Sequence, residues 1–234
     1  MNLQKQPKRA GNIWIRATKV RFFWLLVTIL GVILAAPALP SSANGEWEAV
    51  GLAVVVVFAA SYVSHGLRRL WILAFLVSLL LVTVGLDMFL HDSIVSRTIL
   101  FLVLLVILAR TSISVLTFVL EEGKVGAEHI YGAICAYVLI AMAFATLDFL
   151  LESLLPGSFS GVQVKMVTDR GWWQFFYFSF TTLSTVGYGD IVPLTMRARS
   201  FVVIEQLVAV FYVAILIARL TGMYSSGTKP EGDN

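Results

Sequence analysis

The sequence predicts an all-α polytopic membrane protein with six transmembrane helices and one short re-entrant helix. Hydrophobic residues make up 59% of the 234 residues and charged residues only 13%, about half the share of an average soluble domain. Six apolar stretches have the composition of bilayer-crossing helices, which need roughly 20 residues. A seventh stretch, of about a dozen mostly aromatic residues, is too short to cross and leads into a glycine-rich string.

The chain begins with a basic segment, residues 1–21, followed by an apolar span at 22–39. The excess of positive charge ahead of this span predicts a cytoplasmic N-terminus. The same pattern is also typical of a secretory signal peptide, with Ser41, Ser42 and Ala43 as a possible cleavage site. Either interpretation leaves the later topology unchanged.

Three further spans are predicted at residues 49–64, 70–90 and 94–116. The paired Arg68 and Arg69 place the turn between the second and third spans on the cytoplasmic side. Residues 22–118 therefore form a four-span membrane domain. A polar, glycine-containing linker at 121–126 separates it from the rest of the chain.

The second part of the chain, residues 126–222, has a different order of elements. A fifth span at 129–151 leads to a polar loop at 152–171, the aromatic stretch at 172–184, the glycine-rich string and a sixth span at 200–220. Residues 223–234 form a short cytoplasmic tail, because six spans place both termini inside.

The glycine-rich string reads Thr185, Val186, Gly187, Tyr188, Gly189 and Asp190. Gly187 and Gly189 lack a Cβ atom and can adopt backbone conformations that make successive carbonyl groups point the same way. A row of inward carbonyls can replace the hydration shell of a cation.

The order of outer helix, short aromatic helix, string and inner helix resembles the pore domain of the potassium channel superfamily, in a prokaryotic-type chain of six spans. The resemblance implies that the carbonyls of Thr185, Val186, Gly187 and Tyr188, with the Thr185 hydroxyl, hold K⁺. It implies a tetramer, because one chain supplies a quarter of such a filter. We expect the following residues to support the filter: Gly189, Asp190, Thr181 and Ser184.

Glu205 lies inside the sixth span, eight residues past Arg197 and therefore roughly 12 Å along the helix axis. A carboxylate at this depth is costly and marks a candidate functional site. We expect it to brace the filter by bonding Thr181 or Ser184 of its own or a neighbouring chain; the alternative is a carboxyl facing water of the outer vestibule. Asp148, near the outer end of its span, is expected to face interfacial water.

The sixth span has no glycine between Arg199 and Leu220, and Ala209 stands where many potassium channels have a hinge glycine. The usual bending gate is therefore in doubt. Side chains at three-to-four spacing are expected to line an apolar inner cavity; they are Val210, Val213, Ile217 and Thr221.

The first four spans resemble a voltage sensor in helix count only. A sensing helix needs several basic residues at every third position. The fourth span has Arg97 and Arg110, thirteen residues apart, which favours two side chains reaching opposite bilayer surfaces. We expect conduction to depend weakly on membrane potential.

The sequence thus predicts a passive potassium-selective channel, a homotetramer in the cell membrane of a bacterium. No enzyme is expected, because no nucleophile, base or metal set is clustered. K⁺ is expected as the permeating ion and no cofactor, with membrane lipids and its own copies as partners, no nucleic acid and no soluble ligand-binding domain. The alternative is a non-conducting partner subunit that uses the pore module for assembly.

Overall fold

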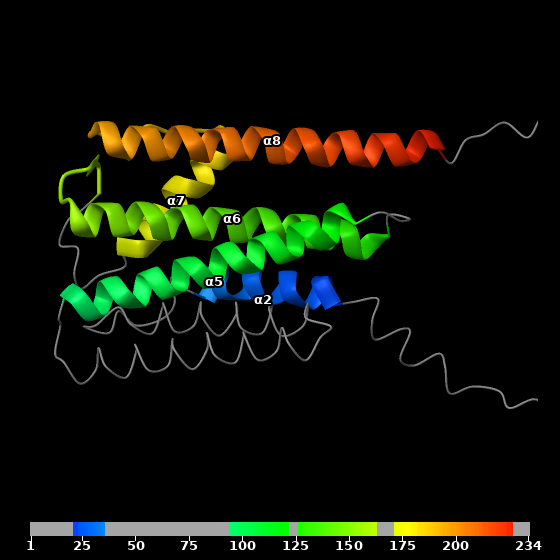
Figure 1. Ribbon diagram of the computed structural model, residues 1–234, viewed down its shortest axis with the longest axis horizontal. Helices are drawn as coiled ribbons and strands as arrows, with labels where there is room; N and C mark the ends of the chain where they lie inside the picture. The colour runs from blue at the N-terminus through cyan, green and yellow to red at the C-terminus, as the bar shows by residue number, and fades with distance from the viewer. Residues whose placement is uncertain (1–20, 36–93, 122–125, 163–170, 227–234) are drawn as a thin grey trace, which may run out of the picture.

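The computed structural model describes residues 21–35, 94–121, 126–162 and 171–226 (Figure 1). The described part is mostly helical. Its elements are α2 (Arg21–Ala35), α5 (Ile94–Leu120), α6 (Ala127–Leu154), β1 (Phe159–Ser160), α7 (Gly171–Leu183), β2 (Val192–Pro193) and α8 (Met196–Ser226). The spans expected at 49–64 and 70–90 lie outside the described residues.

Three helices of the described part are long and apolar enough to cross a bilayer. They comprise Thr98–Leu120, Ala127–Leu154 and Met196–Arg219, which confirms the expected fourth, fifth and sixth spans as helices of spanning length. α2 is apolar over Phe22–Ala35, and the remainder of the predicted first span, up to residue 39, lies outside the described residues.

α6 is the central helix of the described part (Figure 1). It packs against α2 and α5 on one side and against α7 and α8 on the other. In its most apolar window 67% of the residues are buried, compared with 22% for α8. Helix α8 therefore leaves most of its apolar surface uncovered in a single chain.

Small residues allow the neighbouring helices to approach α6 closely. Ala141 and Ala145 are fully buried, and a Cβ atom on Gly132 would lie 3.1 Å from Cγ2 of Val119 on α5. Since lipid chains are as apolar as leucine, helices in a bilayer associate mainly through such close packing and through hydrogen bonds.

A carboxylate holds the first helix on α6. The backbone N–H of Phe22, at the start of α2, donates to Oε2 of Glu128 at 3.0 Å, a position where a negative charge favours a helix N-terminus. The Phe22 ring also stacks on Phe118 of α5, with centroids 4.8 Å apart.

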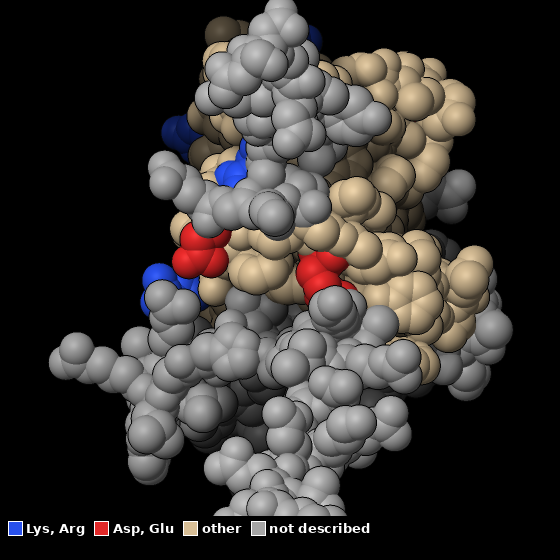
Figure 2. All heavy atoms as spheres, turned by 90° about the vertical axis from the view of Figure 1, so that its right-hand side faces the viewer, with Lys and Arg blue, Asp and Glu red and all other residues tan. Residues whose placement is uncertain are grey.

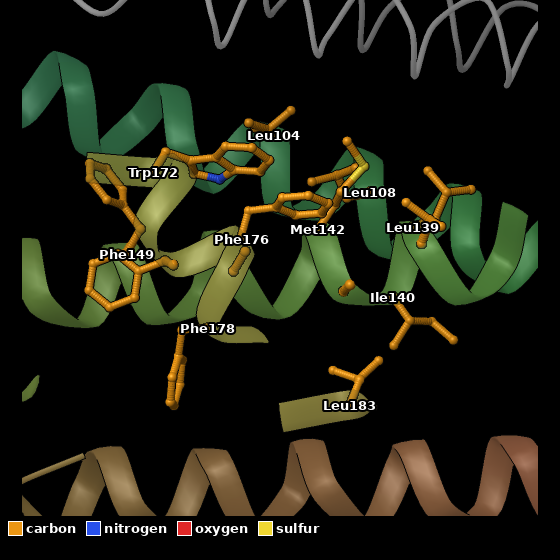
Figure 3. Packing of buried hydrophobic residues seen from close by; sticks show 14 of the residues in the cluster. Leu104, Leu108, Leu139, Ile140, Met142, Phe149, Trp172, Phe176, Phe178 and Leu183 are labelled. Carbon is orange, nitrogen blue, oxygen red and sulfur yellow. The ribbon is translucent and has the colours of Figure 1, made fainter. Parts of the chain in front are cut away.

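The short helix α7 crosses the layers from α5 and α6 toward α8, and its aromatic side chains fill the space between them (Figure 3). Trp172 stacks on Phe176 with centroids 5.5 Å apart, and its indole N–H donates to Oγ1 of Thr146 on α6 at 3.1 Å. Phe175 is fully buried. The aromatic run expected at 172–184 thus forms a 13-residue helix that positions the string that follows it.

Candidate functional site

The loop after the string is held by the polar loop after α6. Strands β1 and β2 pair antiparallel, with Ser160 opposite Val192, and the N–H of Leu194 donates to the carbonyl of Ser158 at 2.8 Å. A Cβ atom on Gly161, whose φ is +81°, would lie 1.7 Å from the carbonyl oxygen of Asp190. Only glycine permits this contact between the two loops.

Glu152 fixes the polar loop itself. This fully buried side chain accepts the N–H of Gly157 on Oε1 at 2.7 Å and that of Phe159 on Oε2 at 2.8 Å. Both carboxylate oxygens are thereby satisfied, which a buried carboxylate requires. Glu152 was expected only as the first residue of that loop; it is instead part of α6.

The backbone of the string alternates in handedness. Thr185 has φ +61°, Gly187 φ +52° and Gly189 φ +79°, and Thr185 is the single non-glycine residue with positive φ among the described residues. Val186 and Tyr188, between them, have ordinary negative φ. Left-handed residues at every second position turn successive carbonyl groups to the same side, whereas an ordinary strand alternates them.

The string is anchored on the C-terminal end of α7 by backbone hydrogen bonds. The carbonyl of Thr181 accepts the N–H of Val186 at 2.9 Å and that of Gly187 at 3.2 Å. The Thr181 hydroxyl donates to the carbonyl of Phe178, within its own helix, and the Ser184 hydroxyl to that of Phe180. Thr181 contacts the string through its backbone and not through its side chain.

Tyr177 of α7 lies beside Tyr188, near the C-terminal end of the string. Its ring stacks on that of Tyr188 at 6.2 Å and 4°. Desolvation and then a hydrogen bond and the negative charge of Asp190 raise the pKa of the Tyr177 phenol, so the phenol stays protonated and available as a donor to Asp190. The Asp190 carboxylate also accepts the N–H of Ile191 at 3.0 Å.

Glu205 is fully buried on α8 and faces α7. Its Oε1 atom forms a hydrogen bond with the Ser179 hydroxyl, which also donates to the carbonyl of Ala141 on α6 at 2.9 Å. One polar chain therefore connects α8, α7 and α6. Within a single chain the partner of Glu205 is Ser179, two residues before the Thr181 and five before the Ser184 that the sequence suggested.

Hydrogen-bond donors are few around the Glu205 carboxyl. The Ser179 hydroxyl has one hydrogen and two neighbouring acceptors, the carbonyl of Ala141 and Oε1 of Glu205. Oε2 of Glu205 is buried and has no hydrogen-bond partner among the described residues. An unpaired buried charge is costly, which makes this position demanding for a carboxylate.

The structure corrects the environment that the sequence predicted for Asp148. It was expected to face interfacial water, but it is 1% exposed, and its Oδ2 atom has no hydrogen-bond partner among the described residues. It lies close enough to interact electrostatically with Glu205. The helical position near the end of α6 suggested water, yet α7 and the polar loop cover that end.

The four residues expected to line an inner cavity, Val210, Val213, Ile217 and Thr221, are exposed on α8 in the single chain. Ala209, at the expected hinge position, is buried at 1% exposure. Its small side chain allows close packing there. A larger residue at this point would separate α8 from α6.

Comparison with known proteins now identifies the family. The sequence profile of a family described as "Ion channel" matches residues 132–226. The potassium channel protein kcv of Paramecium bursaria Chlorella virus 1 is 30% identical over 81 residues, which is 34% of this chain and 85% of that protein. The chain belongs to the potassium channel superfamily. The matched region is its pore domain, from the second turn of α6 to the end of α8.

Other potassium channels are also similar to part of the chain. A voltage-gated potassium channel of Aeropyrum pernix is 31% identical over 101 residues, 43% of this chain and 30% of that protein. Two-pore potassium channel 4 of Arabidopsis thaliana is 30% identical over 83 residues, 36% of this chain and 28% of that protein. The match covers less than a third of the length of these two relatives.

The sequence did not indicate three residues that shape this pore domain: Ser179, Glu152 and Asp148. Ser179 is the one small polar residue between Trp172 and Phe180, and that contrast was a usable signal. Glu152 stands five residues before Gly157, a spacing compatible with a carboxylate that binds loop N–H groups. Nothing in the sequence distinguishes the buried Asp148 from an interfacial one.

Proposed function

We propose that the protein conducts potassium ions passively and selectively through a filter formed by residues Thr185–Tyr188 of four chains. The observation that carries the proposal is the alternation of φ at Thr185, Gly187 and Gly189, fixed on the end of α7. Carbonyl groups aligned in this way replace the hydration shell of K⁺. Membership of the potassium channel superfamily supports the same function.

A homotetramer follows from the geometry of a filter, since one chain supplies one quarter of each carbonyl ring. The uncovered surface of α8 supports this assembly. Large apolar side chains remain more than half exposed on it, for example Phe211 at 60% and Ile217 at 55%. We assign the face with Val210, Val213, Ile217 and Thr221 to the ion pathway and the other exposed positions to neighbouring chains and lipid.

We further propose six spans in the cell membrane with both termini in the cytoplasm, which places the filter at the outer surface and the end of α8 at the inner one. Glu205 would brace the filter through Ser179, and Thr181, Ser184, Gly189 and Asp190 would hold its shape. The backbone bonds of Thr181 to Val186 and Gly187 support this role.

Flux measurements on purified protein in liposomes test the function directly. With an outward potassium gradient, we expect uptake of rubidium tracer and much slower uptake of sodium tracer. Equal flux of sodium and potassium contradicts selectivity. Absence of any flux from a tetramer of correct mass favours the alternative, a non-conducting subunit that uses the pore module for assembly.

A further inference from the structure

Helix α7 is attached to α6 by two hydrogen bonds that lie about two helical turns apart. In the first turn of α7, the indole N–H of Trp172 donates to Oγ1 of Thr146 at 3.1 Å. Seven residues later, the Ser179 hydroxyl donates to the carbonyl of Ala141 at 2.9 Å. Residues seven apart share one face of a helix and lie roughly 10 Å apart along its axis. The two bonds are therefore separate points of attachment between the same two helices.

The bond between Trp172 and Thr146 is a polar link in apolar surroundings. Trp172 is 8% exposed and Thr146 is 0% exposed. The Thr146 hydroxyl donates its hydrogen to the carbonyl of Met142 at 2.8 Å, so its oxygen remains as an acceptor, and an indole has one donor and no acceptor. The Trp172 ring stacks on Phe176, and Figure 3 shows the two rings side by side. Stacking and hydrogen bond together hold the indole in one orientation.

The neighbouring Trp173 makes no such link. Its Nε1 atom is buried and has no hydrogen-bond partner among the described residues. Its ring contacts those of Trp172 and Phe176 edge to face, with centroids 5.2 Å and 5.5 Å apart. Two adjacent residues of the same type therefore differ in a hydrogen bond to α6, and this difference can be tested.

Two attachments fix the orientation of α7, whereas a single one would let the helix pivot. The carbonyl of Thr181, two residues after Ser179, accepts the N–H groups of Val186 and Gly187 in the string. A rotation of α7 about Ser179 would therefore carry the string with it. Because a binding site requires its groups to be held within about 0.5 Å, the bond at the far end of α7 bears directly on the shape of the string.

The attachment in the first turn of α7 uses uncharged groups inside the protein. Figure 2 looks onto the opposite end of α6 and α8, where charged side chains of the described residues lie at the surface. The indole and the hydroxyl instead meet beside the membrane-spanning length of α6, Ala127–Leu154. Helices in a bilayer associate through hydrogen bonds and close packing, so a neutral link at this place fixes two helices without burying a charge.

We propose that Trp172 and Thr146 are positioning residues of the filter. Their hydrogen bond fixes the first turn of α7 on α6 and thereby holds the string in its ion-binding shape. The inference rests on the proposed function, since it names residues that hold the same site without touching the ion. Potassium bound in a filter stabilises the folded tetramer by mass action. The melting temperature of the tetramer is therefore higher in potassium than in sodium, and we call this difference the potassium effect.

Flux per folded tetramer and the potassium effect together test the proposal. Trp172→Phe removes the N–H donor, and Thr146→Val removes the acceptor from a side chain of similar shape. Each should lower rubidium flux per folded tetramer about fivefold, the population shift that one hydrogen bond supports, and should reduce the potassium effect. Thr146→Ser keeps the acceptor and should retain most of both. The double variant should be no worse than the worse single variant, because both residues act through one bond.

Trp173→Phe is the matched control, because it makes the same change at a residue with no hydrogen bond to lose, and it should leave both measurements unchanged. The proposal is overturned if Trp172→Phe behaves like Trp173→Phe, if the effects of Trp172→Phe and Thr146→Val add, or if both variants lower only the melting temperature. If Trp172→Phe does not assemble, Thr146→Val and Thr146→Ser decide. A wild type with neither flux nor a potassium effect contradicts the proposed function together with this inference.

Discussion

The two ends of the pore domain are held together in different ways. At the filter end, several polar side chains connect neighbouring elements: Glu152 binds the loop after α6, Trp172 binds Thr146, and Glu205 is linked through Ser179 to α6. At the opposite end, the described residues show two such connections of α8, Tyr212 to the carbonyl of Ala133 and Arg219 to that of Glu121. A cavity of about 220 Å³ lies beside these connections, between α5, α6 and α8.

The polar side chains that link neighbouring helices and loops are concentrated at the filter end of the described residues. A filter works only if its carbonyl groups are held in fixed positions, which requires side chains locked by packing and hydrogen bonds. A gate must change shape, and elements that move are those with few buried contacts.

Gly161→Ala should destabilise the filter end more than any of the other substitutions below. The added Cβ would overlap the carbonyl of Asp190 and the residue would keep φ +81°, so overlap and backbone strain together cost about 3 kcal/mol per chain. We expect loss of potassium flux and a tetramer that dissociates at lower temperature. Gly157→Ala is the matched control, because Gly157 has φ +86° but nothing within 4 Å; an equal effect of both variants would show that the overlap is unimportant.

Gly187→Ala should abolish conduction with a smaller loss of stability. No atom of the same chain lies within 4 Å of the added Cβ, but an alanine at φ +52° costs about 1–2 kcal/mol and turns the filter carbonyls out of line. Potassium flux in liposomes measures the first effect and the melting temperature of the tetramer the second. Gly126→Ala, with an ordinary φ of −108°, should change neither; normal flux through Gly187→Ala would contradict the assignment of the filter.

Two substitutions of Glu205 distinguish a role in hydrogen bonding from a role that requires its negative charge. Glu205→Gln keeps an acceptor oxygen for the Ser179 hydroxyl and should retain most of the flux and stability. Glu205→Ala leaves buried polar partners unsatisfied at about 1–3 kcal/mol each and should lower both. Tetramer melting and potassium flux of the two variants are compared; loss of function in Glu205→Gln equal to that in Glu205→Ala would mean that an ionised carboxylate is required.

Tyr212→Phe should have the smallest effect and should act at the other end only. It removes one hydrogen bond to the carbonyl of Ala133, worth about 1 kcal/mol. We expect unchanged selectivity between potassium and sodium and an altered open probability in single-channel recordings. Tyr131→Phe is the control on α6. A change in selectivity would show that the two ends are coupled more tightly than their contacts indicate.

The sequence predicted the filter end in outline because its signals are local. Glycine spacing, the short aromatic helix and the apolar length of α5, α6 and α8 each depend on neighbouring residues. The features that the sequence did not predict depend on which helices face each other in the fold. Glu205 was recognised as costly, but its partner Ser179 and the burial of Asp148 follow from the crossing of α7 between α6 and α8.

The left-handed backbone of Thr185 carries a consequence beyond geometry. A β-branched residue at φ +61° is held against its own preference by the surrounding structure, whereas glycine would occupy the position without cost. Glycine, however, has no hydroxyl group to offer an ion. In the proposed filter, local stability and ion binding are therefore opposed at this residue: selection for heat resistance would remove the side chain that selection for conduction would retain.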